Sequence, residues 1–197
     1  DKGGGDDKGR HGKTRRPNRK FWLTRDVKKA VAYLTTPPEV MKAAHVLWPR
    51  ADEVIRVLTE TKGKNMYFDI ETNRSLEMTC FGFSFDEKRA WCVPMVVSPR
   101  EGYYYSDTPR ILRALAVAMR DNTTVIHNSL FDLFVMGYKY GIPAPRRVYD
   151  TMLAHHRLFP EVEKSLGHCL SLYTDQPYHK NEGVFEAHGH EQRPSLP

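Results

Sequence analysis

Asn65-Met66-Tyr67-Phe68-Asp69-Ile70-Glu71-Thr72-Asn73 is the stretch from which the fold is best predicted. Read as a strand, it puts its methionine, phenylalanine and isoleucine on one face, and its tyrosine, Asp69 and Glu71 on the other. Two carboxylates that close repel each other unless a cation lies between them, and a divalent cation with oxygen ligands is the usual solution. A plain strand running into a turn explains the same pattern without metal. The stretch therefore predicts a half-buried strand, with a metal site as one interpretation of its end.

A second stretch favours the metal interpretation. Residues 123–128 are rich in β-branched side chains and predict a short strand, and residues 129–136 follow at once in helical register. Asp132 falls in the first turn of that helix. A carboxylate there, close to the end of a strand, is positioned to face the same cation as Asp69 and Glu71.

These residues resemble a known family. Asp69-Ile70-Glu71-Thr72 resembles the first motif, and Asn128-x-x-x-Asp132 the second, of the four-carboxylate (DEDD) 3′-to-5′ exonucleases. Residues 148–156, 164–166 and 173–178 are similar, more narrowly, to the proofreading domain of phage DNA polymerases related to bacterial DNA polymerase I. The resemblance implies an α+β, ribonuclease H-like fold, in which a mixed sheet is flanked by helices.

The resemblance also implies a reaction, the metal-dependent hydrolysis of phosphodiester bonds at nucleic-acid 3′ ends, with a single-stranded DNA end as the expected substrate. Asp69 would bridge two ions, Glu71 would bind one and orient the attacking water, and Asp132 would hold the second ion. Oxygen-only ligands favour Mg²⁺ or Mn²⁺ over zinc. The residues implied to contact the substrate are Thr72, Asn128 and Phe131. A polymerase domain or subunit is an implied partner.

The family's fourth carboxylate is missing from the pattern. It belongs to a third motif, Tyr-x-x-x-Asp or His-x-x-x-x-Asp, whereas the last aspartate here is Asp175 and the nearest match, Tyr178-x-x-x-Glu182, has a different acid and lies early. The third motif is therefore truncated, supplied in trans or lost. In the last case the chain would be a catalytically impaired exonuclease-like fold that serves as a nucleic-acid-binding or structural assembly subunit. Both hypotheses stay open here.

Composition excludes several other classes. The 197 residues are 40% hydrophobic and 27% charged, which is typical of a soluble protein with one domain. No apolar run reaches the roughly 20 residues of a membrane helix, and no secretory signal is visible. Three widely spaced cysteines favour buried thiols in a cytoplasmic or other intracellular reducing compartment over a disulfide or zinc framework. Because the sequence begins at Asp1 and not at methionine, we expect a processed, trimmed or partial chain.

The chain divides into four predicted segments. Residues 1–20 hold eight Lys or Arg against three Asp, and predict a disordered basic tail that either binds phosphates or only aids solubility. Residues 21–62 predict a helical lead-in that packs on the body or on a partner. Residues 63–180 predict the exonuclease domain, and 181–197 a loop or frayed end.

Helices in the lead-in are expected from Thr24 as N-cap, over Val40 to Leu47, and over 51–61. After the first motif strand, strands 79–85 and 89–97 predict an antiparallel meander. Thr108-Pro109 predicts a helix start, and later helices are expected over 131–140, from Asp150 or Thr151, and over 165–172. In the helix that begins near Asp150 we expect Met152, Leu153 and Leu158 to face inward.

Overall fold

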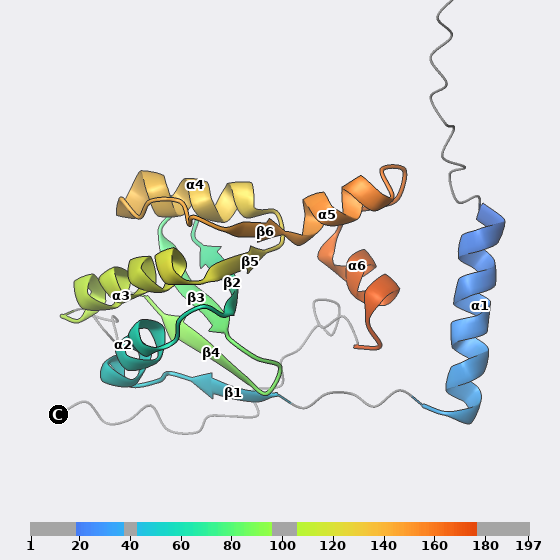
Figure 1. Cartoon of the computed structure of the whole chain (residues 1–197), viewed down its shortest axis with the longest axis horizontal. Coiled ribbons are helices and arrows are strands. Elements are labelled where there is room, and N and C mark those ends of the chain that lie inside the picture. The colour runs from blue at the N-terminus through green and yellow to red at the C-terminus, as the bar shows by residue number, and fades with distance from the viewer. Residues whose placement is uncertain (1–18, 38–42, 96–105, 177–197) are drawn as a thin grey trace, which may run out of the picture. The chain divides into compact units, whose positions relative to one another are not determined.

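The computed structural model describes residues 19–37, 43–95 and 106–176, and the chain divides into two compact units. The first unit, Asp1–Glu39, contains the helix α1 (Arg19–Thr35). The second unit, Val40–Pro197, contains all the other described helices and strands (Figure 1). None of the described helices is long and apolar enough to cross a membrane.

A mixed six-stranded sheet forms the centre of the second unit, with the strand order β1-β4-β3-β2-β5-β6. Its strands are β1 (Ala44–Leu47), β2 (Asn65–Thr72), β3 (Met78–Ser84), β4 (Arg89–Pro94), β5 (Thr123–Ile126) and β6 (Val148–Asp150). The β2-β3-β4 meander is antiparallel, and the pairs β1-β4, β2-β5 and β5-β6 are parallel. This mixed sheet confirms the predicted α+β class.

The helices of the second unit begin and end at residues whose chemistry explains their bounds. They are α2 (Ala51–Glu60), α3 (Thr108–Asp121), α4 (Ser129–Tyr140), α5 (Thr151–Leu158) and α6 (Leu166–Tyr173). Proline in the first turn begins α3, where its missing N–H has no helical partner to lose. Gly141, at φ 63°, ends α4 in the left-handed conformation that glycine adopts without strain.

The core lies on one face of the sheet. Met66, Phe68 and Ile70 of β2 are buried, while Asp69 and Glu71, which alternate with them, are exposed, as predicted from the strand pattern. Helices α2 and α3 lie side by side (Figure 1). Their buried side chains join those of β2 in one cluster, and α4 adds further contacts to it; those residues are Val54, Leu58, Ile111, Leu115, Val135 and Met136.

The predicted helical lead-in 21–62 is wrong in its second element. Residues 44–47 form the strand β1, which pairs in parallel with β4, and not a helix. The apolar spacing from Val40 to Leu47 suits a helix, but propensity is a weak preference that a long-range ladder along the edge of β4 overrides. The helix predicted at 51–61 is confirmed as α2. Since β1 and α2 belong to the sheet's unit, that unit begins at Val40 and not at Gly63.

Two details of the predicted helices also need correction. Helix α1 begins at Arg19, so Thr24 lies inside it and is not its N-cap. Leu153 and Leu158 of α5 are 58% and 64% exposed instead of facing inward. The reason is that His155 takes the buried position of this short helix, where its ring bonds the Tyr173 hydroxyl at 2.8 Å and the Glu163 carbonyl at 3.0 Å.

We expect Val54→Ala to lower the free energy of unfolding by about 2 kcal/mol, because it removes two fully buried methyl groups and leaves a cavity. Urea unfolding measures the change. Arg56→Ala, one half-turn further along α2 on the exposed side, is the matched control and should change stability by less than about 0.5 kcal/mol. Equal small effects of both would contradict the placement of α2 in the core.

Candidate carboxylate site

Asp132 reaches the end of β2 from the first turn of α4. The register between β2 and β5 ends at Tyr67 opposite Val125, so the Ile70 N–H lies beyond this ladder. Asp132 Oδ1 accepts a hydrogen bond from Ile70 N at 3.1 Å. The side chain is 4% exposed. The two predicted carboxylate motifs are therefore joined by a direct bond between α4 and β2.

The charge of Asp69 also acts on Asp132. Burial and then the charge of Asp69 raise the pKa of the Asp132 carboxyl to about 7, with a further contribution from Asp150 that also raises it. The Ile70 N–H bond acts in the opposite direction and lowers it. A cation bound here would stabilise the ionised form of this buried carboxylate, which otherwise lies next to other negative charges.

Glu71 and Thr72 follow Asp69 along β2. Glu71 is exposed on the same face as Asp69 and lies opposite Cys80 in the ladder with β3. The register with β3 shifts between Glu71 and Thr72, and Thr72 is half-buried. The Thr79 hydroxyl donates to the Glu71 carbonyl at 3.1 Å, which fixes the backbone at this shift.

Asn128 stands at the junction between β5 and α4. Its φ of 66° and ψ of 54° place it in the left-handed region, which asparagine tolerates better than most residues. Its side chain is exposed and makes no capping bond to α4. Phe131, in the first turn of α4, is 42% exposed. These two of the three predicted substrate contacts therefore lie at the surface, one before and one within the helix turn that carries Asp132.

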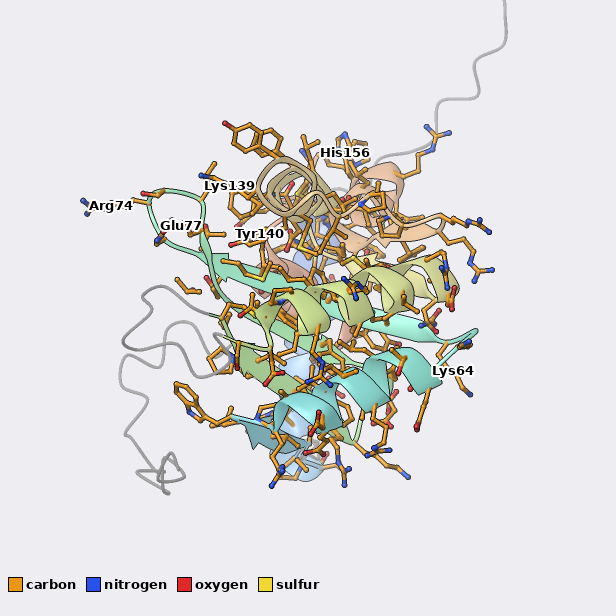
Figure 2. The ribbon with its side chains drawn as sticks, turned by 90° about the vertical axis from the view of Figure 1, so that its left-hand side faces the viewer. Lys64, Arg74, Glu77, Lys139, Tyr140 and His156 are labelled. Carbon is orange, nitrogen blue, oxygen red and sulfur yellow. The ribbon has the colours of Figure 1, made fainter. Side chains whose placement is uncertain are left out.

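The turn between β2 and β3 follows Thr72 directly and is held by hydrogen bonds of its own. Asn73 Oδ1 accepts from Ser75 N at 2.9 Å and Glu77 N at 3.0 Å, an arrangement typical of asparagine in turns. The Tyr140 hydroxyl accepts from Met78 N at 2.6 Å and ties the end of α4 to β3. Figure 2 shows Glu77 on this turn beside Tyr140.

Asp150 is the carboxylate whose importance sequence reasoning missed. It ends β6 and caps α5 by accepting from Met152 N at 2.8 Å and Leu153 N at 3.1 Å. It also accepts from Ser129 N and Ser129 Oγ, both at 2.7 Å, and from Asn128 N at 3.3 Å. Burial alone would raise its pKa, but these hydrogen bonds lower it. The sequence marks Asp150 only as a helix start; its bonds to Asn128 and Ser129 join segments that are distant in the chain.

The histidines near the carboxylates hold structural positions. His127 contacts the Thr151 hydroxyl through Nδ1 at 2.9 Å and the Lys164 carbonyl through Nε2 at 3.0 Å, so both ring nitrogens are engaged at the end of β5. His155 is buried and His156 is exposed.

The donor set suits Mg²⁺ or Mn²⁺ in its chemistry, because Asp69, Glu71 and Asp132 offer carboxylate oxygens only. Within the described ranges, no group of three or more His, Cys, Asp or Glu side chains is arranged to hold a metal ion. Asp150 adds negative charge nearby, but hydrogen bonds already occupy its oxygens. Tyr178 and Glu182 lie outside the described residues. The assignment of the three carboxylates as metal ligands therefore stays a prediction.

Comparison with known proteins finds solved structures with a similar fold but no protein with a similar sequence. No protein-family model matches the chain, and no curated protein sequence matches it. The catalytic core of RRP6 from Trypanosoma brucei superposes with a TM-score of 0.55 at 11% identity, over 80% of this chain and 42% of that one. The EXO domain of Nibbler from Aedes aegypti superposes with a TM-score of 0.56 at 14% identity, over 79% of this chain and 81% of that one.

These likenesses confirm the predicted α+β, ribonuclease H-like fold. At such low identity they establish the fold alone. The chain also spans less than half of the RRP6 catalytic core that it matches. Neither structure is described as a polymerase. The narrower resemblance to the proofreading domain of DNA polymerase I therefore stays a prediction.

Proposed function

We propose that this chain is a metal-dependent 3′-to-5′ exonuclease domain, which removes nucleotides from nucleic-acid 3′ ends, with single-stranded DNA as the expected substrate. The observation that carries the proposal is the bond from Ile70 N to Asp132, which brings the carboxylate of α4 to the strand that bears Asp69 and Glu71. The ribonuclease H-like exonuclease fold supports it.

In this proposal Asp69, Glu71 and Asp132 would hold Mg²⁺ or Mn²⁺, two ions being expected for full activity. Bound divalent ions supply a nucleophilic water near neutral pH and stabilise the charge on the phosphate and the leaving oxygen. The chain's own contribution is to fix the carboxylates in place. The Ile70 N–H orients Asp132, and the exposed side of β2 leaves Asp69 and Glu71 accessible to substrate.

Substrate contacts are proposed at the surface around these carboxylates. Phe131 is exposed in the same helix turn as Asp132, where an aromatic face accepts any base by stacking. Asn128 and Thr72 offer polar groups on either side, one at the start of α4 and one at the end of β2. Such contacts would position a terminal nucleotide without reading its sequence.

A second candidate function is favoured by the incomplete set of carboxylates. The described residues contain no arranged metal cluster, and the sequence has no third motif with its aspartate. A non-catalytic nucleic-acid-binding or assembly subunit on the same fold would explain both observations. Its binding would depend strongly on salt and not on divalent metal. A polymerase domain or subunit that completes the site would instead restore the first function.

Digestion of a 5′-labelled single-stranded DNA oligonucleotide with Mn²⁺ tests the proposal. We expect the chain to shorten the oligonucleotide stepwise from its 3′ end, and EDTA or a 3′-phosphate on the oligonucleotide to stop it. Asp69→Asn should lower the rate by about 10²- to 10³-fold, as for the loss of one preorganised electrostatic group. A matched RNA oligonucleotide shows whether DNA is preferred.

Binding without shortening, equal with Mn²⁺ and with EDTA, would support the non-catalytic function instead. Shortening by the Asp69→Asn variant at the parental rate would point to a contaminating nuclease. In either case the proposed catalytic role of Asp69 would be rejected for this chain.

A further inference from the structure

Two cysteines share the face of the sheet that carries Asp69 and Glu71. In the β2-β3 ladder Cys80 lies opposite Glu71, and in the β3-β4 ladder Cys92 lies opposite Gly82, which is itself opposite Asp69. Directly opposed residues of neighbouring strands point to the same face, as do alternate residues of one strand. The two thiols and the two exposed carboxylates are therefore neighbours on one surface.

Each of the two thiols also affects the ionisation of the other. Their side chains interact by hydrogen bonding, which shifts the pKa of both, and both residues are half-buried and so partly accessible. This bond and then burial raise the pKa of Cys80 well above its usual range. The same bond lowers the pKa of Cys92 to about 7, although burial acts against it.

The strand register favours a link in which a third atom joins the two sulfurs over a direct disulfide bond. Cys80 pairs with Pro94 and Cys92 with Gly82, so the two cysteines are diagonal neighbours on adjacent strands. Diagonal neighbours lie about 7 to 8 Å apart at Cα, whereas a disulfide needs about 4.4 to 6.8 Å. Closing the sulfur–sulfur bond would need movement of paired strands. An atom that bonds to both sulfurs fills the extra distance.

We propose that Cys80 and Cys92 form a dithiol modification site for thiophilic agents that bond two sulfurs at once, of which an organic trivalent arsenical is the representative. The reaction is a condensation without oxidation or reduction. The arsenic of an arsenoxide forms one bond to each sulfur, the two thiol protons leave with its oxygen as one water molecule, and arsenic stays trivalent. The bound group would stand beside Glu71.

Peptide mapping of the full chain treated with phenylarsine oxide tests the site. Trypsin cuts after Arg74, Lys88, Arg89 and Arg100, so it places Cys80 in peptide 75–88 and Cys92 in peptide 90–100. We expect one arsenical for each chain, with these two peptides joined through arsenic. The link should resist excess glutathione, a monothiol, and be released by dimercaptopropanol, a dithiol.

Serine variants provide the matched controls. Cys80→Ser and Cys92→Ser should each lose the glutathione-resistant adduct, whereas Cys169→Ser, which alters the buried third cysteine, should keep it. Circular dichroism confirms that each variant is folded, and the peptide map of the parent decides the question if one is not. An adduct that joins other peptides, that persists in Cys80→Ser, or that glutathione removes would overturn the proposal, as would the absence of any adduct.

An effect of the bound arsenical on catalysis is expected only if the proposed nuclease function is correct. The binding of the arsenical to the two thiols does not depend on that function. If the chain is a nuclease, loading the dithiol should inhibit oligonucleotide shortening at least tenfold, and dimercaptopropanol should restore it. Cys92→Ser should retain activity and resist the arsenical. A joined peptide pair in a chain without nuclease activity would leave the site standing and reject only the proposed function.

Discussion

Asp132→Asn is expected to remove most of the proposed nuclease activity while making the metal-free protein more stable at pH 8. The asparagine keeps an oxygen that accepts from Ile70 N, and it removes a charge that is buried next to Asp69. Ionisation of Asp132 in this position lowers the free energy of unfolding of the parent, and the variant has no such loss. We expect nucleotide release to fall by about 10²- to 10³-fold, because a preorganised charged group is lost from the site.

The sign of the stability change depends on pH. An unfolded aspartate has a pKa of about 3.9, whereas that of Asp132 is raised to about 7 in the fold. Between these values the folded chain binds more protons than the unfolded one, so stability falls as pH rises from about 4 to about 7. The full difference is at most about 4 kcal/mol, at about 1.36 kcal/mol for each pH unit. The gain from Asp132→Asn should therefore be larger at pH 8 than at pH 5.

Urea unfolding in EDTA at pH 5 and pH 8 measures this change. Asp121→Asn is the matched control, since its partner Arg120 lowers the pKa of Asp121, and its replacement should bring no gain at pH 8. Adding Mg²⁺ at pH 8 should stabilise the parent more than the Asp132→Asn variant, if the carboxylates bind the ion as proposed. A variant that is less stable than the parent at pH 8 in EDTA would refute the electrostatic argument.

The parts of the site that the sequence predicted are the local ones. Alternation along β2 is a property of five or six adjacent residues, so the exposure of Asp69 and Glu71 opposite a buried face followed from the pattern alone. The position of Asp132 in the first turn of a helix was also local information. Its bond to Ile70 could not be derived, because it depends on how far β5 runs along β2.

The parts that were missed depend on pairing between distant segments. Residues 44–47 form the strand β1 because they pair with the edge of β4, although their apolar spacing favours a helix. The proximity of Cys80 and Cys92 depends on the register of β3 and β4, which a spacing of twelve residues in the sequence does not disclose. Both are properties of the sheet and not of either segment by itself.

Asp150→Ala is expected to lower the free energy of unfolding by about 3 to 5 kcal/mol, more than the loss of an ordinary helix cap at about 1 kcal/mol. The carboxylate caps α5 and also accepts two bonds from Ser129 and one from Asn128 N, so its loss leaves donors of two segments without an acceptor. Because these bonds lower its pKa, its contribution is present above about pH 4 and disappears in stronger acid.

The same substitution should loosen the start of α4 and with it Asp132. Hydrogen exchange should accelerate at the amides of Ser129 and Ile70 more than at Leu58 in α2. Any nuclease activity should fall through kcat more than through KM, because a misplaced carboxylate affects the reaction more than binding. Ser165→Ala, which removes the side-chain cap of the neighbouring α6, is the matched control and should cost about 1 kcal/mol without changing exchange at Ile70. Equal effects of the two substitutions on stability and exchange would show that Asp150 is only a helix cap, and that α4 holds Asp132 in place without it.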